Sequence, residues 1–135
     1  MRRTLAISVF TVAAAILTLQ AAPVRGQTGN VSIQDGVICL DIVDREPTGV
    51  DTVFAADVGR LHCFTRVVGV EGTSTVSHVW YWGDEERARV QLSVRSPNWR
   101  TNSSKVIQEH ETGQWRVDVL DADGNVLSTV RFRIR

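Results

Sequence analysis

The chain has few of the residues that would mark a catalytic centre. Its 135 residues include two cysteines and three histidines. His62, His78 and His110 lie far apart in the sequence, without the spacing of metal ligands. No nucleophile motif surrounds Ser103, and no cofactor motif occurs. We therefore expect a protein that is not an enzyme and that has no metal or cofactor. The alternative is a hydrolase or another enzyme with an unrecognised site.

The sequence also lacks an excess of positive charge. Lys105 is the only lysine, and the formal net charge at pH 7 is zero. Residues 1–26 contain three arginines and no acid, so the rest of the chain is mildly acidic. A mildly acidic domain is a poor match for nucleic acid or an anionic membrane surface. We expect neither as a partner.

Long apolar runs are missing except at the N-terminus. The basic head Met1-Arg2-Arg3 precedes an apolar run over residues 4–19, and small residues follow up to Gly26. This order is typical of a signal peptide, and the run is short for a permanent anchor. The sequence predicts a signal peptide over residues 1–26 and a periplasmic or secreted protein. No stable membrane insertion is expected after cleavage.

The two cysteines are Cys39 and Cys63. Their number is even, which in an exported chain predicts one disulfide bond, and their spacing matches no zinc motif. Each shares a face of its expected strand with valines, so we expect them to pair across two early strands. The alternative is a pair of buried free thiols.

Strand patterns dominate the remainder. Residues 27–35 are polar and predict a flexible leader, and residues 36–135 predict one β domain. Apolar and polar residues alternate over 88–95, 115–119 and 130–135, as half-buried strands require. Residues 99–107 are ambiguous, with a short helical turn as an alternative over 104–111. About seven strands predict an all-β antiparallel β-sandwich with an immunoglobulin-like plan; a small β-barrel is the second choice.

Aromatic residues supply the best lead to function. Trp82 and Trp99 lie beside turns, and Trp99 is followed by Arg100 and, six positions on, Lys105. An indole face next to cationic donors suits sugar rings or peptides. These four residues form the candidate binding surface, for an envelope glycan or a protein partner. A corner in which Trp99 fills one end of the sandwich is the other interpretation.

Several separated motifs together resemble a known family. They are Asp44-Arg45-Glu46-Pro47, Val58-Gly59-Arg60-Leu61-His62-Cys63-Phe64-Thr65, His78-Val79-Trp80-Tyr81, Trp99-Arg100-Thr101-Asn102-Ser103-Ser104-Lys105, Gly113-Gln114-Trp115-Arg116-Val117 and Asp121-Ala122-Asp123-Gly124. In this order they resemble the bacterial domain of unknown function 2914 family. The family often has an aromatic residue where this chain has Asn102. The resemblance implies an envelope-associated β domain over residues 37–134 and no reaction.

Overall fold

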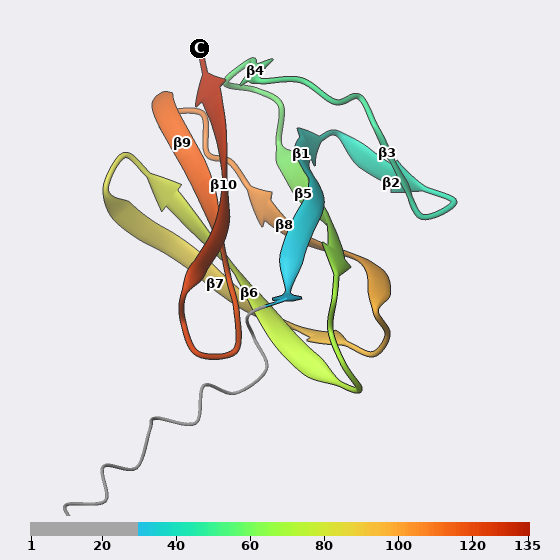
Figure 1. Cartoon of the computed structure of the whole chain (residues 1–135). Helices are drawn as coiled ribbons and strands as arrows, with labels where there is room; N and C mark the ends of the chain where they lie inside the picture. The colour runs from blue at the N-terminus through green and yellow to red at the C-terminus, as the bar shows by residue number, and fades with distance from the viewer. Residues whose placement is uncertain (1–29) are drawn as a thin grey trace, which may run out of the picture.

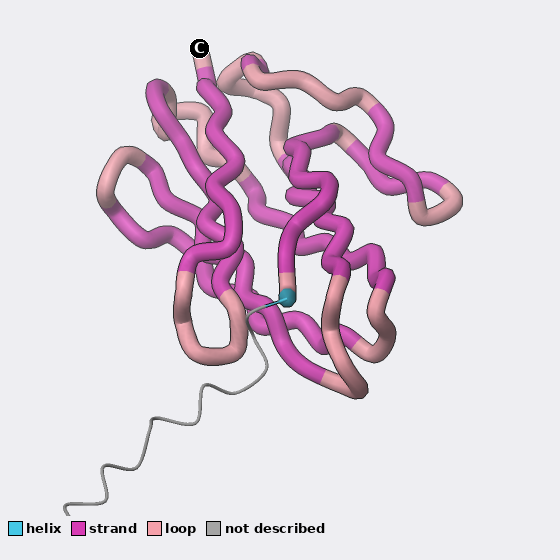
Figure 2. The backbone as a smooth tube through the Cα atoms, in the orientation of Figure 1, coloured by secondary structure: helices cyan, strands magenta, loops and turns pink. Residues whose placement is uncertain are grey.

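The computed structural model describes residues 30–135, so the expected signal peptide lies outside the described residues. Apart from the single helical residue Asn30, the described part consists of β-strands and their connections, as Figure 2 shows. None of its residues forms a helix of the length and apolarity that crossing a membrane requires.

Two sheets form the body of the domain (Figure 1). The smaller sheet has the strand order β1–β5–β8, with the bounds Ser32–Cys39, Arg60–Val68 and Asn98–Val106. The larger sheet has the order β4–β10–β9–β6–β7, with the bounds Val53–Phe54, Val126–Ile134, Gly113–Leu120, Ser74–Trp82 and Glu85–Val94. Neither sheet is hydrogen-bonded to the other within residues 30–135, so the domain is a sandwich and the predicted fold class is confirmed.

The strand order follows an immunoglobulin-like plan. The first, second and fifth long strands form one sheet, and the third, fourth, sixth and seventh form the other. All long neighbours are antiparallel, whereas the short β4 runs parallel to the end of β10. Trp80 is fully buried on β6, the third long strand, at the place where immunoglobulin domains carry a buried tryptophan.

The core follows the alternation read from the sequence. On β9, Trp115, Val117 and Val119 are buried, and the residues between them are partly exposed. On β10, Val130 and Phe132 are buried while the arginines between apolar positions are exposed. Side chains alternate between the two faces of a strand, so every second side chain packs against the opposite sheet. Two apolar clusters result, a larger one around Trp80, Trp115 and Phe132 and a smaller one around Val67, Val76 and Val119.

The predicted disulfide is wrong. Strands β1 and β5 are indeed neighbours, but their register pairs Ile38 with Cys63 and Cys39 with His62. Directly paired residues share a face and successive residues alternate, so the two thiols point to opposite faces of the sheet. Both cysteines are free and fully buried. Burial raises the pKa of the Cys63 thiol, and it raises that of Cys39 as well.

Three segments differ from the expected boundaries. The expected leader, 27–35, already contains the first residues of β1, because Ile33 packs on the smaller core cluster. The turn-rich segment after Asp41 forms an extra hairpin of β2 (Asp41–Val43) and β3 (Glu46–Thr48), which projects beside the smaller sheet (Figure 1). The helical alternative over 104–111 is wrong, because β8 continues to Val106 and a loop follows.

Candidate ligand-binding groove

The projecting hairpin turns through a backbone conformation that L-residues avoid. Asp44 and Arg45 have φ angles of 50° and 66°. Two successive positive φ angles are typical of the tight type I′ turn that favours Asn-Gly or Asp-Gly. An arginine in the left-handed region costs roughly 1–2 kcal/mol. Local strain of this kind concentrates at functional sites, so the position of Arg45 calls for an explanation beyond chain reversal.

The outer face of the smaller sheet carries a second group of cations. Arg66 on β5 is paired directly with Arg100 on β8, and Phe64 is paired with Asn102. Like charges directly opposite on neighbouring strands destabilise a sheet. The paired arginines therefore oppose the stability of the sheet unless a negative group lies near them.

Acidic neighbours satisfy these arginines only in part. Arg100 makes an ion pair of 2.7 Å with Glu46 of the hairpin, and Arg66 approaches Asp35 at 4.0 Å. The Nε of Arg66 also donates to Asn98 at 2.8 Å. Within residues 30–135, the Arg45 side chain makes no ion pair and no hydrogen bond. Arg45 is thus free to bind a ligand, and Arg66 keeps donors that no protein group uses.

These side chains surround one open groove between the hairpin and the outer face of β5 and β8. Its volume is about 530 Å³, within the range of roughly 300–1,000 Å³ typical of small-molecule sites. Three arginines and no acid line it; the full lining is Ile42, Arg45, Phe64, Arg66, Ser96, Asn98, Trp99, Arg100, Thr101 and Asn102. We call this set the arginine groove.

A different polar cluster occupies the inner face of the same two strands. His78 on β6 is fully buried, with its Nε2 3.0 Å from Thr65 Oγ1 and its Nδ1 2.7 Å from Ser103 Oγ. Trp80 Nε1 donates to the same Ser103 Oγ at 3.0 Å. Burial lowers the pKa of His78 to about 4, and the ring is neutral at pH 7.

This inner cluster has part of a hydrolase geometry, but its side chains are buried. Ser103 and His78 are within hydrogen-bond distance, as a nucleophile and its base would be. The other ring nitrogen of His78, however, contacts the hydroxyl of Thr65 and no carboxylate. Ser103 is 5% exposed and His78 is 0% exposed, so no substrate reaches them. The cluster satisfies buried polar groups in the core.

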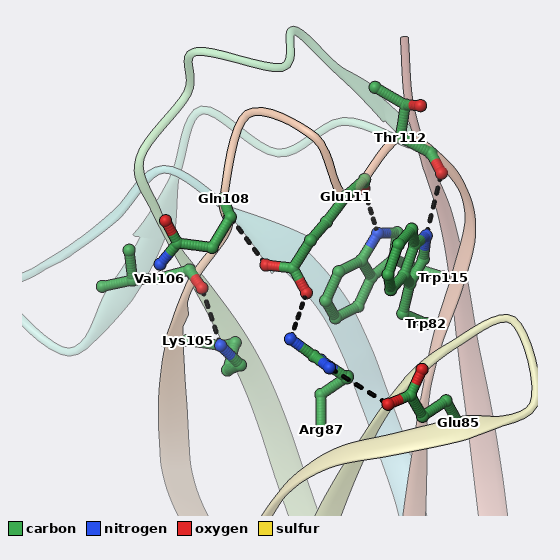
Figure 3. A network of polar contacts seen from close by, with 9 residues as sticks. All are labelled: Trp82, Glu85, Arg87, Lys105, Val106, Gln108, Glu111, Thr112 and Trp115. Carbon is green, nitrogen blue, oxygen red and sulfur yellow. Dashed lines mark hydrogen bonds and ion pairs between the residues drawn. The ribbon is translucent and has the colours of Figure 1, made fainter.

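A third polar network lies at the far end of β8, around the loop that leads to β9 (Figure 3). The fully buried carboxylate of Glu111 accepts from the Gln108 N–H at 2.8 Å and pairs with Arg87 at 2.9 Å. The indoles of Trp82 and Trp115 donate to the carbonyls of Thr112 and Glu111. These bonds fix the loop to β6, β7 and β9.

The four residues of the predicted binding surface therefore separate into two pairs. Trp99 and Arg100 line the arginine groove, and Trp99 also packs on the smaller core cluster. Trp82 and Lys105 belong to the network of Figure 3, where Lys105 Nζ donates to the carbonyl of Val106.

Sequence reasoning missed Arg45, Arg66 and the two groove asparagines, Asn98 and Asn102. The alternation of β5 and β8 could have placed Arg66 and Arg100 on outward faces. It contained no signal for the register that sets them opposite each other.

Comparison with known proteins confirms the family resemblance over part of the chain. Residues 73–134 match the model of the family described as "Protein of unknown function (DUF2914)". The motifs around Asp44 and His62 lie before the matched range. No curated protein matches the chain.

Several solved structures match the chain. One of them is a mutant β-glucosidase from Listeria innocua in complex with laminaribiose, with a TM-score of 0.41 and 7% sequence identity. The alignment covers 78% of this chain and 16% of the glucosidase chain. The present chain thus spans about a sixth of the length of that enzyme.

Proposed function

We propose that this protein is an exported, non-enzymatic binding module that holds an envelope glycan or an envelope protein in the arginine groove. The observation that carries the proposal is the groove itself. Three arginines line one open concavity, and no acidic side chain lines it. Such sites bind ligands through a small number of convergent polar groups.

A catalytic role is the second candidate, and the local chemistry argues against it. Among the lining residues there is no histidine, cysteine or carboxylate that could act as a base or a nucleophile. The one serine–histidine contact within residues 30–135 is sealed in the core. Arginine and asparagine side chains bind and orient; they do not exchange protons near neutral pH.

The proposal is tested by retention on isolated envelope material. The purified protein is mixed with an envelope glycan preparation and, separately, with envelope protein extract, and bound protein is measured after washing. Wild type should be retained by one of the two, and the double variant Arg45→Gln/Arg66→Gln should not. A matched double variant, Arg131→Gln/Arg133→Gln, removes the same charge from exposed positions on β10. Equal retention of both variants would show that the groove is not the site.

Export is tested separately by N-terminal sequencing of the protein recovered outside the cytoplasm. We expect a start between Ala22 and Gln27, as the small residues after the apolar run predict. Recovery of the intact precursor from the membrane would show that the N-terminal segment is an anchor.

A further inference from the structure

We infer that the ligand of the arginine groove is a short acidic oligosaccharide, whose carboxylates bind Arg45 and Arg66 and whose hydroxyls bind Asn98 and Asn102. This inference rests on the proposed function and specifies its ligand class. Three features of the groove support it: its charge, its size and polarity, and the strained placement of Arg45.

The charge of the groove calls for an anion. Arg66 and Arg100 are paired directly across β5 and β8, and Arg45 reaches the same space from the hairpin. Glu46 neutralises Arg100 at 2.7 Å, whereas the 4.0 Å contact of Asp35 leaves Arg66 weakly paired. A carboxylate placed between Arg45 and Arg66 would relieve the like-charge repulsion and accept paired N–H donors. The groove is thus electrostatically incomplete without an anion.

The size and polarity of the groove favour a sugar chain over a globular partner. A volume of about 530 Å³ suits a small ligand, whereas a stable protein interface needs roughly 800 Å² from each partner. The amide of Asn102 offers two donors and an acceptor, and that of Asn98, whose oxygen accepts from Arg66, still offers two donors; both suit neighbouring hydroxyls. Phe64, which is paired with Asn102 across β5 and β8, adds an apolar residue to the lining.

The backbone of the hairpin supports the assignment independently. Arg45 occupies a positive φ of 66°, where glycine would avoid the steric cost. Its side chain makes no hydrogen bond and no ion pair within the described residues, so no polar contact of the protein offsets this cost. Placement of a guanidinium over the groove explains the cost, since strained residues persist where they serve binding.

The ligand class is tested with sugars that differ only in charge. Tetramers of galacturonate and of mannuronate, and the methyl esters of both, are titrated into the purified protein by calorimetry at low salt. At least one acidic tetramer should bind at least about tenfold more tightly than its ester, because esterification removes the charge-assisted hydrogen bonds. Arg45→Gln should lower that affinity by a similar factor, and Arg133→Gln should leave it within about twofold.

The other outcomes separate this inference from the proposed function. Equal binding of acid and ester, lost in Arg45→Gln, would overturn the acidic class and keep the groove as a glycan site. If a tetraglutamate peptide binds and neither acidic tetramer does, the assignment of an oligosaccharide ligand is overturned, and an acidic protein is favoured as the ligand. Absence of binding to all probes would overturn the inference, while retention on envelope material would still support the proposed function. Tetramer binding that is unaffected by Arg45→Gln would overturn both.

Discussion

The two faces of the smaller sheet use polar residues in opposite ways. On the inner face, Thr65 and Ser103 complete a closed network around the neutral His78, which water and ligands do not reach. On the outer face of the same strands, Arg66 and Arg100 are charged, mutually repulsive and open to solvent. A satisfied polar cluster stabilises a fold, whereas an unsatisfied and accessible one is poised to bind. Position relative to the sheet, more than residue type, decides which role a polar side chain has.

The largest effect should come from breaking the inner face. Ser103→Ala removes the partner of both Trp80 Nε1 and His78 Nδ1. Two buried polar groups without partners cost about 1–3 kcal/mol each, so the free energy of unfolding should fall by about 2–6 kcal/mol. Ser104→Ala is the matched control, because Ser104 points outward and bonds only to the exposed Arg60. It should cost less than about 0.5 kcal/mol in urea unfolding. Similar losses for the two variants would contradict the comparison of the faces.

Acid should weaken the inner face next. Burial lowers the pKa of His78 to about 4 from its ordinary 6.5. Between these values the unfolded chain binds a proton that the folded chain refuses, so the stabilisation is complete above pH 6.5 and is lost as the pH falls toward 4. The loss is about 3 kcal/mol at 1.36 kcal/mol per pKa unit.

This acid effect is measured as the difference in unfolding free energy between wild type and His78→Gln from pH 7 to pH 4. The difference should fall by about 3 kcal/mol over this range, because glutamine does not titrate. The exposed His110→Gln serves as control and should follow wild type. Parallel curves for His78→Gln and wild type would show that His78 takes up its proton without loss of folding.

Most of the fold could be predicted from the sequence, because alternation reports burial directly. The pattern of β7 and β10 and the Asp-Gly hairpin after Leu120 all agree with the structure. Register could not be predicted, because period two gives the face of each residue and not its partner on the next strand. Because the register was unknown, the sequence predicted a disulfide between Cys39 and Cys63, which lie on paired strands but on opposite faces of the sheet.

The groove escaped sequence reasoning for the same physical reason. It depends on the pairing of Arg66 with Arg100 and on a hairpin turn made by Asp44 and Arg45. An Asp-Arg pair lacks the glycine that signals such a hairpin turn. Trp99 and Arg100 could be found because an aromatic beside cations is visible locally.

A smaller effect should come from relaxing the outer face at its strained turn. Arg45→Gly removes the left-handed strain and should raise the unfolding free energy by up to about 1 kcal/mol, since the gain is partly offset by the freer unfolded chain. The same change should weaken binding of the acidic tetramer by at least about tenfold. Arg45→Gln keeps the strain and should lose binding without a gain in stability. Loss of stability in Arg45→Gly would show that Arg45 has a structural role.

The smallest effect concerns the ion pair that neutralises Arg100. Glu46 and Arg100 are 2.7 Å apart, but their side chains are 59% and 41% exposed. An exposed pair contributes about 0.2–1 kcal/mol and is screened by salt. Glu46→Gln should therefore lower the unfolding free energy by less than about 1 kcal/mol, and the loss should vanish in 1 M salt.

The same change should strengthen binding, because the negative charge of Glu46 repels an acidic ligand held by Arg45 and Arg66 in the neighbouring groove. Removal of one negative charge about 6 Å from a bound carboxylate is worth roughly 0.7 kcal/mol in water, or about a threefold gain in affinity. Glu86→Gln is the matched control: it breaks an equally short exposed pair, with Arg89 at 2.7 Å on β7, away from the groove. It should cost similar stability and leave affinity unchanged. Weaker binding by Glu46→Gln alone would mean that the hairpin must be tied to β8 for the groove to form, and that Arg100 belongs to the scaffold of the outer face.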